Sequence, residues 1–173
     1  LGTGRADYAL HVDGKLVGAI EAKREGTTLS AVSVQSSKYM KLTSEQQLRA
    51  WRTPLPLRYE SNGAETWFAN GLDPAPQRSR RVFSFHRPET VAAWMTDAEA
   101  EPETPSYRSR LRHMPTLDDR GLRPAQIDAV AGIESALAAD KPRALVQMAT
   151  GAGKTFTAVT TTYRLLKHAR ARR

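Results

Sequence analysis

The stretch ADYALHVDGKLVGAIEAK, residues 6–23, decides the fold of the first half of this chain. Two runs of strand-forming residues flank Asp13-Gly14, a dipeptide that strongly favours a β-hairpin. Side chains alternate between the two faces of a strand, so Glu21 and Lys23 share one face and Ile20 points to the other. The stretch therefore predicts a hairpin whose second strand carries an acid and a lysine on one face.

The register of this hairpin decides whether Asp7 joins the acid and the lysine. A plain two-residue loop sends the two carboxylates to opposite faces of the hairpin. With Gly14 as the left-handed residue of a type I turn plus bulge, His11 pairs with Lys15, and all three side chains project from one face. A catalytic interpretation requires the bulged register, whereas a solvated ladder of charges needs no particular register.

Asp7 and Glu21 on one face are expected to hold Mg²⁺, which prefers oxygen ligands and keeps several waters for the substrate phosphate. Lys23 would orient or help deprotonate the attacking water and contact the phosphate. A helix is expected over residues 29–42, and its Gln35 and Tyr39 lie four apart and share a face. These residues form the candidate nuclease site.

Further elements follow in residues 56–95. Strands at 56–61 and 64–70 flank Asn62-Gly63, a second hairpin signal, and 80–86 reads as another strand before a short helix at 87–95. The first part of the chain is therefore expected to form a mixed sheet with helices packed on it. Residues 97–120 are polar, contain prolines and show no apolar period, which is typical of a linker.

The segment QMATGAGKT, residues 147–155, places a glycine-containing loop between a predicted buried strand at 143–149 and a helix at 156–169. Such a loop binds nucleotide phosphates with backbone amides, here from Thr150, Gly151, Ala152 and Gly153. Lys154 is expected to reach the β- and γ-phosphates, and Thr155 to supply a hydroxyl to Mg²⁺. The strict Walker A pattern fails, because Met148 stands where its first glycine belongs.

Composition narrows the range of functions. The chain has 173 residues, no cysteine, a formal charge of +8 and a pI near 10.1. The absence of cysteine excludes disulfides and thiolate zinc sites and suits a cytoplasmic protein. The sequence contains no apolar run long enough to span a bilayer, so no membrane is expected as a partner. The positive charge favours a polyanion such as DNA.

The motifs resemble those of two enzyme families. Asp7, Glu21-Ala22-Lys23 and Gln35-x-x-x-Tyr39 resemble the motifs of PD-(D/E)xK nucleases of the RecB-like group. ATGAGKT resembles the first motif of superfamily 2 helicases and translocases. LRPAQ, residues 122–126, resembles the adenine-reading segment of those motors, in which Gln126 would contact the adenine and Arg123 would lie nearby. The first residue is Leu and the last segment stops inside an apparent helix, so the chain is expected to be a fragment.

Together these parts resemble the restriction (R) subunit of type I restriction–modification enzymes. The resemblance implies an α/β fold, with a PD-(D/E)xK nuclease core in residues 1–96 and the beginning of a RecA-like P-loop motor domain in 121–173. It also implies Mg²⁺- and ATP-dependent cleavage and translocation of double-stranded DNA, with methylation and specificity subunits as partners. Two alternatives stay open, namely a repair-type helicase–nuclease fusion and a motor with an inactive, DNA-binding nuclease-like module.

Overall fold

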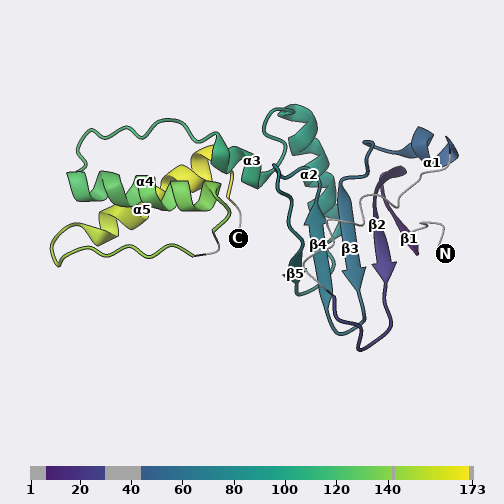
Figure 1. Ribbon diagram of the computed structural model, residues 1–173. Coiled ribbons are helices and arrows are strands. Elements are labelled where there is room, and N and C mark those ends of the chain that lie inside the picture. Colours follow the sequence, from purple (N-terminus) through teal and green to yellow (C-terminus); the bar gives the residue numbers. More distant parts are fainter. Residues whose placement is uncertain (1–6, 30–43, 142, 172–173) are drawn as a thin grey trace. The chain divides into compact units, whose positions relative to one another are not determined.

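The computed structural model describes residues 7–29, 44–141 and 143–171. The chain forms two compact units, Leu1–Glu99 and Ala100–Arg173, of which the first holds the sheet and the second is helical (Figure 1). Among the described helices, none combines the length and the apolar composition that a membrane span requires.

The first unit is built on one five-stranded mixed sheet with the strand order β1-β2-β3-β4-β5. Strands β2 and β3 are parallel, and every other neighbouring pair is antiparallel. The mixed sheet that the sequence predicts is therefore present. Its strands are β1 (Tyr8–Val12), β2 (Lys15–Ala22), β3 (Leu57–Ser61), β4 (Thr66–Asn70) and β5 (Arg80–Val82).

The β1–β2 hairpin has a two-residue loop and a bulge within the strands. Val12 pairs with Lys15, and Asp13 and Gly14 both have positive φ, 48° and 75°, as a type I′ turn requires. The register then shifts by one residue at Leu10/His11.

The expected pairing of His11 with Lys15 is wrong, because His11 pairs with Leu16 and Leu10 pairs with Gly18. Val17 is the extra residue of the bulge, and its side chain is fully buried in the core. One extra residue reverses the alternation of faces, so Asp7 and Glu21 project from the same face of the hairpin. The bulge within the strands therefore does what the catalytic interpretation expected of a bulge at the turn.

The apolar core lies on one face of the sheet. Leu57, Tyr59 and Phe68 pack there against Val91 and Met95 of helix α2 (Pro88–Ala100). Burying side chains of this size contributes about 1.5–3 kcal/mol each. Glycine at position 18 lets β2 approach β3 closely, since a Cβ there would lie 2.2 Å from the Leu57 carbonyl oxygen.

The remaining elements of the first unit agree only in part with the sequence prediction. Antiparallel β3 and β4 form the second hairpin, and the Asn62 Oδ1 atom accepts hydrogen bonds from the amides of Ala64 and Glu65, at 3.0 and 2.8 Å. Strand β5 is shorter than the predicted 80–86, and α2 runs five residues beyond the predicted 87–95. Helix α1 (Ser44–Arg49) was not predicted.

The second unit contains helices α3 (Tyr107–Arg112), α4 (Pro124–Ala138) and α5 (Lys154–His168). Helix α3 lies inside the stretch predicted to be a linker. Ser106 and Ser109 form a reciprocal capping box at its start, and the buried residues of α3 include Arg108 and Arg110. Because these buried residues are polar, the stretch shows no apolar period.

The predicted buried strand at 143–149 is wrong. The segment is extended but forms no strand, and Leu145 is 94% exposed. A strand is defined by backbone hydrogen bonds to a neighbour, and the described part of the second unit offers no neighbouring strand. Leu145 and Val146 are exposed because the described residues of the second unit supply no strand to cover them.

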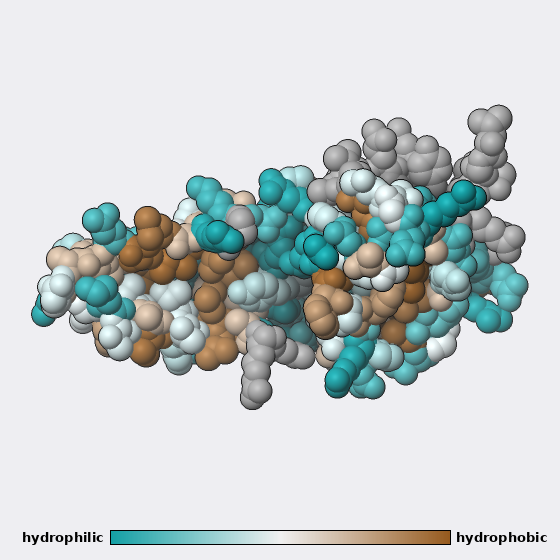
Figure 2. All heavy atoms as spheres, turned by 90° about the horizontal axis from the view of Figure 1, so that it is seen from below, coloured by the Kyte–Doolittle hydropathy of each residue, from teal (hydrophilic) through white to brown (hydrophobic). Residues whose placement is uncertain are grey.

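Helix α5 presents its apolar side chains to solvent. Buried residues on it are Thr157, Thr161 and Arg164, and the last forms an ion pair of 2.6 Å with Glu134 of α4. Hydrophobic residues gather at the surface of the second unit in the view of Figure 2. Along the other side of α5, exposed apolar side chains recur at helical spacing. They are Phe156, Val159, Tyr163 and Leu166.

Candidate functional sites

Three carboxylates, one from β2, one from β3 and one from the residue before β1, lie in one row on the sheet face opposite the core. Glu21 of β2 pairs with Glu60 of β3, and residues paired across strands share a face. Asp7 precedes Tyr8, which pairs with Ile20, so continuation of this register sets Asp7 beside Glu21. The Asp7 Oδ2 atom accepts a hydrogen bond of 2.7 Å from the amide of Ala22. We refer to Asp7, Glu21 and Glu60 as the acid row.

Lys23 lies next to the acid row at the end of β2. Its ammonium contacts a carboxylate oxygen of Glu21 in an ion pair, and its backbone amide donates a hydrogen bond of 2.7 Å to the Ser61 carbonyl. The hydrogen bond to Glu21 raises the pKa of Lys23 above its ordinary value, burial opposes this, and the negative charges of Glu60 and Asp7 raise the pKa further. Lys23 is therefore a cation held among carboxylates at neutral pH.

The structure thus brings together the predicted residues Asp7, Glu21 and Lys23. Gln35 and Tyr39 lie outside the described residues, and their part in the site stays a prediction. Glu60 is the residue that the sequence analysis missed. No local signal marks it, because β2 and β3 pair in parallel across the intervening residues 23–56, and that pairing is visible only in the fold.

The donor chemistry of the acid row fits Mg²⁺. Asp7 and Glu21 offer carboxylate oxygens from adjacent strands, and Mg²⁺ is commonly held by one or two carboxylates together with waters and substrate phosphate. Within residues 7–29, 44–141 and 143–171, no group of three or more His, Cys, Asp or Glu side chains has the arrangement of a complete metal site. The fit is therefore to an ion that keeps most of its coordination for water and phosphate.

In the second unit, the residues predicted to bind phosphate form a loop before α5, and their binding to a nucleotide stays a prediction. Gly151 and Gly153 have φ values of 80° and 87°, and Gly153 is the N-cap of α5. The Lys154 ammonium donates hydrogen bonds to the carbonyls of Met148 and Ala149, at 3.3 and 3.0 Å. The loop thus folds around its own lysine. Thr150 and Ala152 lie in the part of the loop between Ala149 and Gly153.

Gln126 and Arg123 also reach this loop. The Gln126 side chain is buried, accepts a hydrogen bond from the Arg123 amide at 2.9 Å, and donates to the carbonyls of Ala152 and Gly153 at 3.2 and 3.4 Å. The Arg123 guanidinium donates to the Gly151 carbonyl at 3.3 Å. The residues predicted to read adenine therefore hold the loop in this structure, and their contact with adenine stays a prediction.

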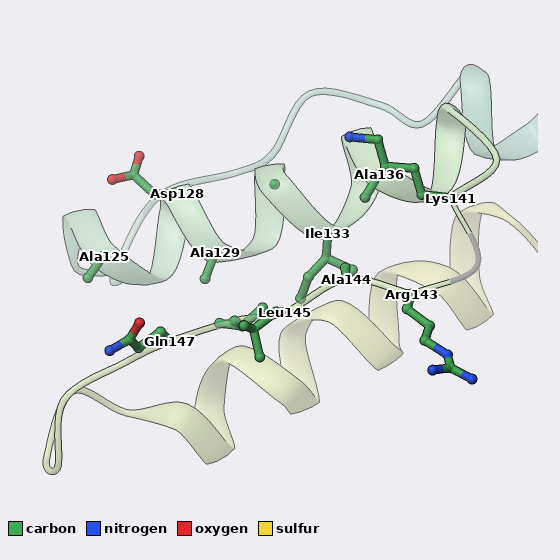
Figure 3. A pocket seen from close by; sticks show the side chains of 12 residues that line it. Ala125, Asp128, Ala129, Ile133, Ala136, Lys141, Arg143, Ala144, Leu145 and Gln147 are labelled. Carbon is green, nitrogen blue, oxygen red and sulfur yellow. The ribbon is translucent and has the colours of Figure 1, made fainter.

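A groove of about 560 Å³ runs between α4 and the extended segment 143–147. Ile133 extends from α4 toward this segment, whereas Asp128 points away from it (Figure 3). Its lining is mainly alanine and aliphatic side chains. The groove separates the segment 143–147 from helix α4, and it contains none of the predicted site residues.

Comparison with known proteins links both units to restriction enzymes. A family model described as "Type III restriction enzyme, res subunit" matches residues 120–173. The type I restriction enzyme EcoKI endonuclease subunit of Escherichia coli (strain K12) is 27% identical over 208 aligned residues. The chain resembles a type I restriction endonuclease subunit over almost its whole length.

This alignment covers 98% of the chain but only 17% of the E. coli subunit. No solved structure matches the chain. The resemblance to a type I R subunit that the motifs predicted is thus supported by an independent comparison of whole sequences. The family match to the res subunit lies in the second unit, which contains the loop around Lys154.

Proposed function

We propose that this chain carries the nuclease site and the first part of the ATP-driven motor of a type I restriction R subunit. The reaction is Mg²⁺-dependent hydrolysis of DNA phosphodiester bonds, coupled to ATP-dependent translocation on double-stranded DNA. The observation that carries the proposal is the bulged register, which sets Asp7 beside Glu21 and Lys23 on one sheet face. The positive charge of the chain agrees with a DNA substrate.

At the nuclease site, the three side chains have separate tasks. Asp7 and Glu21 would hold Mg²⁺, which lowers the pKa of a bound water and neutralises charge on the phosphate. Lys23 is protonated, so it is suited to contact the scissile phosphate through its ammonium group and to orient the attacking water. The contact of Lys23 with Glu21 must loosen when that carboxylate binds the metal. The next carboxylate in the acid row, beside Glu21, is then Glu60 of β3.

At the loop of the second unit, Lys154 would move from the carbonyls of Met148 and Ala149 to the β- and γ-phosphates of ATP. The amides of Thr150, Gly151, Ala152 and Gly153 would hold the phosphates, and Thr155 would bind the nucleotide's Mg²⁺.

Gln126 and Arg123 lie close enough to couple adenine recognition to the shape of the loop. A RecA-like motor would also supply strands to cover Leu145 and the exposed side of α5, including Phe156.

The proposed assembly places the chain in the cytoplasm with methylation and specificity subunits, which would choose the DNA site. The comparisons favour restriction over a repair-type fusion, because both matches are to restriction enzymes. The remaining alternative, a nuclease-like module that only binds DNA, differs from this proposal in that it would not cleave.

Plasmid cleavage separates these functions. The complete R subunit that carries this chain, assembled with its partner subunits, should cut a circular plasmid only when both Mg²⁺ and ATP are present. The Glu21→Gln variant should translocate at the normal rate without cutting. If the unaltered subunit translocates but leaves the plasmid intact, the first unit is an inactive DNA-binding module.

A further inference from the structure

The acid row continues across the sheet to a basic edge. Glu60 pairs with Trp67 of β4, and Trp67 pairs with Arg81 of β5, so these side chains share the face of Glu21. Strand β5 is the last strand of the sheet. From β2 to β5 there are three steps of about 4.8 Å, so Arg81 lies about 14 Å from Glu21 along the row.

The segment around β5 combines arginine with exposed phenylalanine. Residues 78–87 contain four arginines and no acidic residue, and all four are exposed. Phe83, immediately after β5, is fully exposed, with a relative exposure of 106%, and Phe85 is 46% exposed. Aromatic rings among positive charges are the composition of surfaces that bind single-stranded nucleic acid, where bases stack on the rings.

The ion pairs of Arg80 and Arg81 show which of these arginines serves the fold. Arg80 pairs with the buried carboxylate of Asp73 at 3.5 Å, which anchors β5 to the loop after β4. Arg81 pairs with Glu65 at 3.2 Å, but its side chain stays 62% exposed and Glu65 is itself partly exposed. An exposed pair of this kind is weak, so Arg81 can exchange Glu65 for a phosphate at small cost.

We propose that the β5 edge, made of Arg81, Phe83 and Arg87, binds a single-stranded segment of DNA that leads to the acid row. This inference rests on the proposed nuclease function and extends it. The guanidinium groups bind phosphates, and the Phe83 ring stacks on an unpaired base. Strand β5 runs parallel to β2, so Phe83 lies two residues beyond Arg81 in the same direction as Lys23 lies beyond Glu21.

The chemistry favours DNA over a protein partner and a single strand over a duplex. A ring of this exposure without neighbouring charge would suit a protein interface, but here four guanidinium groups lie within ten residues of chain. A phenyl ring can stack only on a base that is not already stacked in a duplex. The edge therefore fits a frayed or melted strand close to the site of cleavage.

The test is DNA binding by the 173-residue chain, measured by fluorescence anisotropy in EDTA so that no cleavage occurs. The probes are a labelled 20-nucleotide single strand and the duplex of the same sequence. Phe83→Ala should weaken single-strand binding about tenfold and duplex binding much less, as expected for the loss of one base–aromatic stack. Phe83→Trp should keep the affinity, and Phe83→Leu should lose it. Arg87→Gln should reduce the salt dependence of binding by about one phosphate contact.

Phe156→Ala is the matched control, because it removes an exposed phenyl ring from the second unit. It should leave single-strand affinity unchanged. The inference is overturned if the chain does not bind single strands, or if Phe83→Leu and Phe83→Trp bind equally well. It is also overturned if Phe83 variants weaken assembly with the partner subunits but not DNA binding, which would indicate a protein interface.

These outcomes do not depend on catalysis. If Phe83 variants lose DNA binding as expected while the complete subunit never cuts, the proposed nuclease function fails and the DNA-binding edge stands. If the subunit cuts normally with Phe83→Ala and binding is unchanged, the proposed nuclease function stands and the DNA-binding edge fails.

Discussion

The amide of Ala22 donates a hydrogen bond of 2.7 Å to the Asp7 carboxylate, which ties the residue before β1 to the end of β2. This bond exists because the bulge at Val17 shifts the register by one residue. It leaves the other carboxylate oxygen of Asp7 for a metal. Asp7 therefore has a structural and a chemical role that mutations can separate.

Substitutions at Asp7 should separate charge from structure. Asp7→Asn keeps an oxygen that can accept from the Ala22 amide, so the first unit should retain its stability while DNA cleavage falls to background. Asp7→Ala should lose cleavage and also about 1 kcal/mol of unfolding free energy, because the hydrogen bond is lost. Denaturant unfolding and plasmid cleavage measure the two effects. Equal stability of the two variants would contradict the structural role.

Glu21→Ala and Lys23→Ala should each abolish cleavage by the complete subunit and leave ATP-driven translocation intact. Both side chains are partly exposed, so neither change removes core packing. A triplex-displacement assay for translocation, run beside plasmid cleavage, tests this. Loss of translocation together with cleavage would indicate misfolding instead of a catalytic role.

Glu60→Gln should reduce cleavage several-fold at limiting Mg²⁺ and less at saturating Mg²⁺. Its carboxylate shares the face of Glu21 and contributes to the raised pKa of Lys23, so its loss weakens the field that attracts the metal and holds the lysine. Glu25→Gln is the control, since it removes the same charge from an exposed turn two residues past Lys23. If cleavage by both variants depends on Mg²⁺ in the same way, the place of Glu60 in the acid row does not affect the metal dependence of cleavage.

Two glycine substitutions should have opposite effects in the second unit. A Cβ at Gly153 would lie 2.1 Å from the Gln126 Nε2 atom, and φ is 87° there, so Gly153→Ala should distort the loop and abolish binding of an ATP analogue to the complete subunit. Gly132 lies in α4 with nothing within 4 Å of the new Cβ. Gly132→Ala should therefore stabilise the unit by about 0.5–1 kcal/mol. Thermal melting and nucleotide binding distinguish the two.

Lys154→Ala should eliminate ATP hydrolysis by the complete subunit, and with it any cleavage that requires movement. The 173-residue chain itself should show no ATPase activity, even with DNA, because no acidic residue follows Asp140 to position Mg²⁺ and water. A phosphate-release assay measures both. DNA-stimulated hydrolysis by the 173-residue chain would show that its loop was wrongly assigned.

The stability of the first unit should fall at both ends of the pH range. Burial, with the charge of Arg80, lowers the pKa of His86, so the unfolded chain binds more protons and stability should drop as pH falls below about 6.5. Burial raises the pKa of Tyr59 to about 12, so stability should also drop as pH rises from about 10 to 12. The Tyr59 hydroxyl lies 2.6 Å from His86 Nδ1. Tyr59→Phe should remove the alkaline loss, as urea unfolding at each pH would show.

The sequence by itself determined the features that depend on neighbouring residues. Asp13-Gly14 and Asn62-Gly63 specify turns through the backbone angles they permit, and both hairpins form. Gly151, Gly153 and Lys154 specify the loop before α5, because glycine adopts positive φ and a lysine at the helix start can reach back over the loop. Such features need no information from distant parts of the chain.

Tertiary structure decided the features that depend on pairing between distant segments. The bulge at Val17 arose because that residue fills the core, and no local signal marks its place within the strand. Glu60 joined the site only through the parallel pairing of β2 with β3. Residues 143–149 are strand-like in sequence yet form no strand, because a strand needs a neighbour to satisfy its backbone hydrogen bonds. Local propensity sets how a segment can fold, and long-range pairing sets which of its side chains meet.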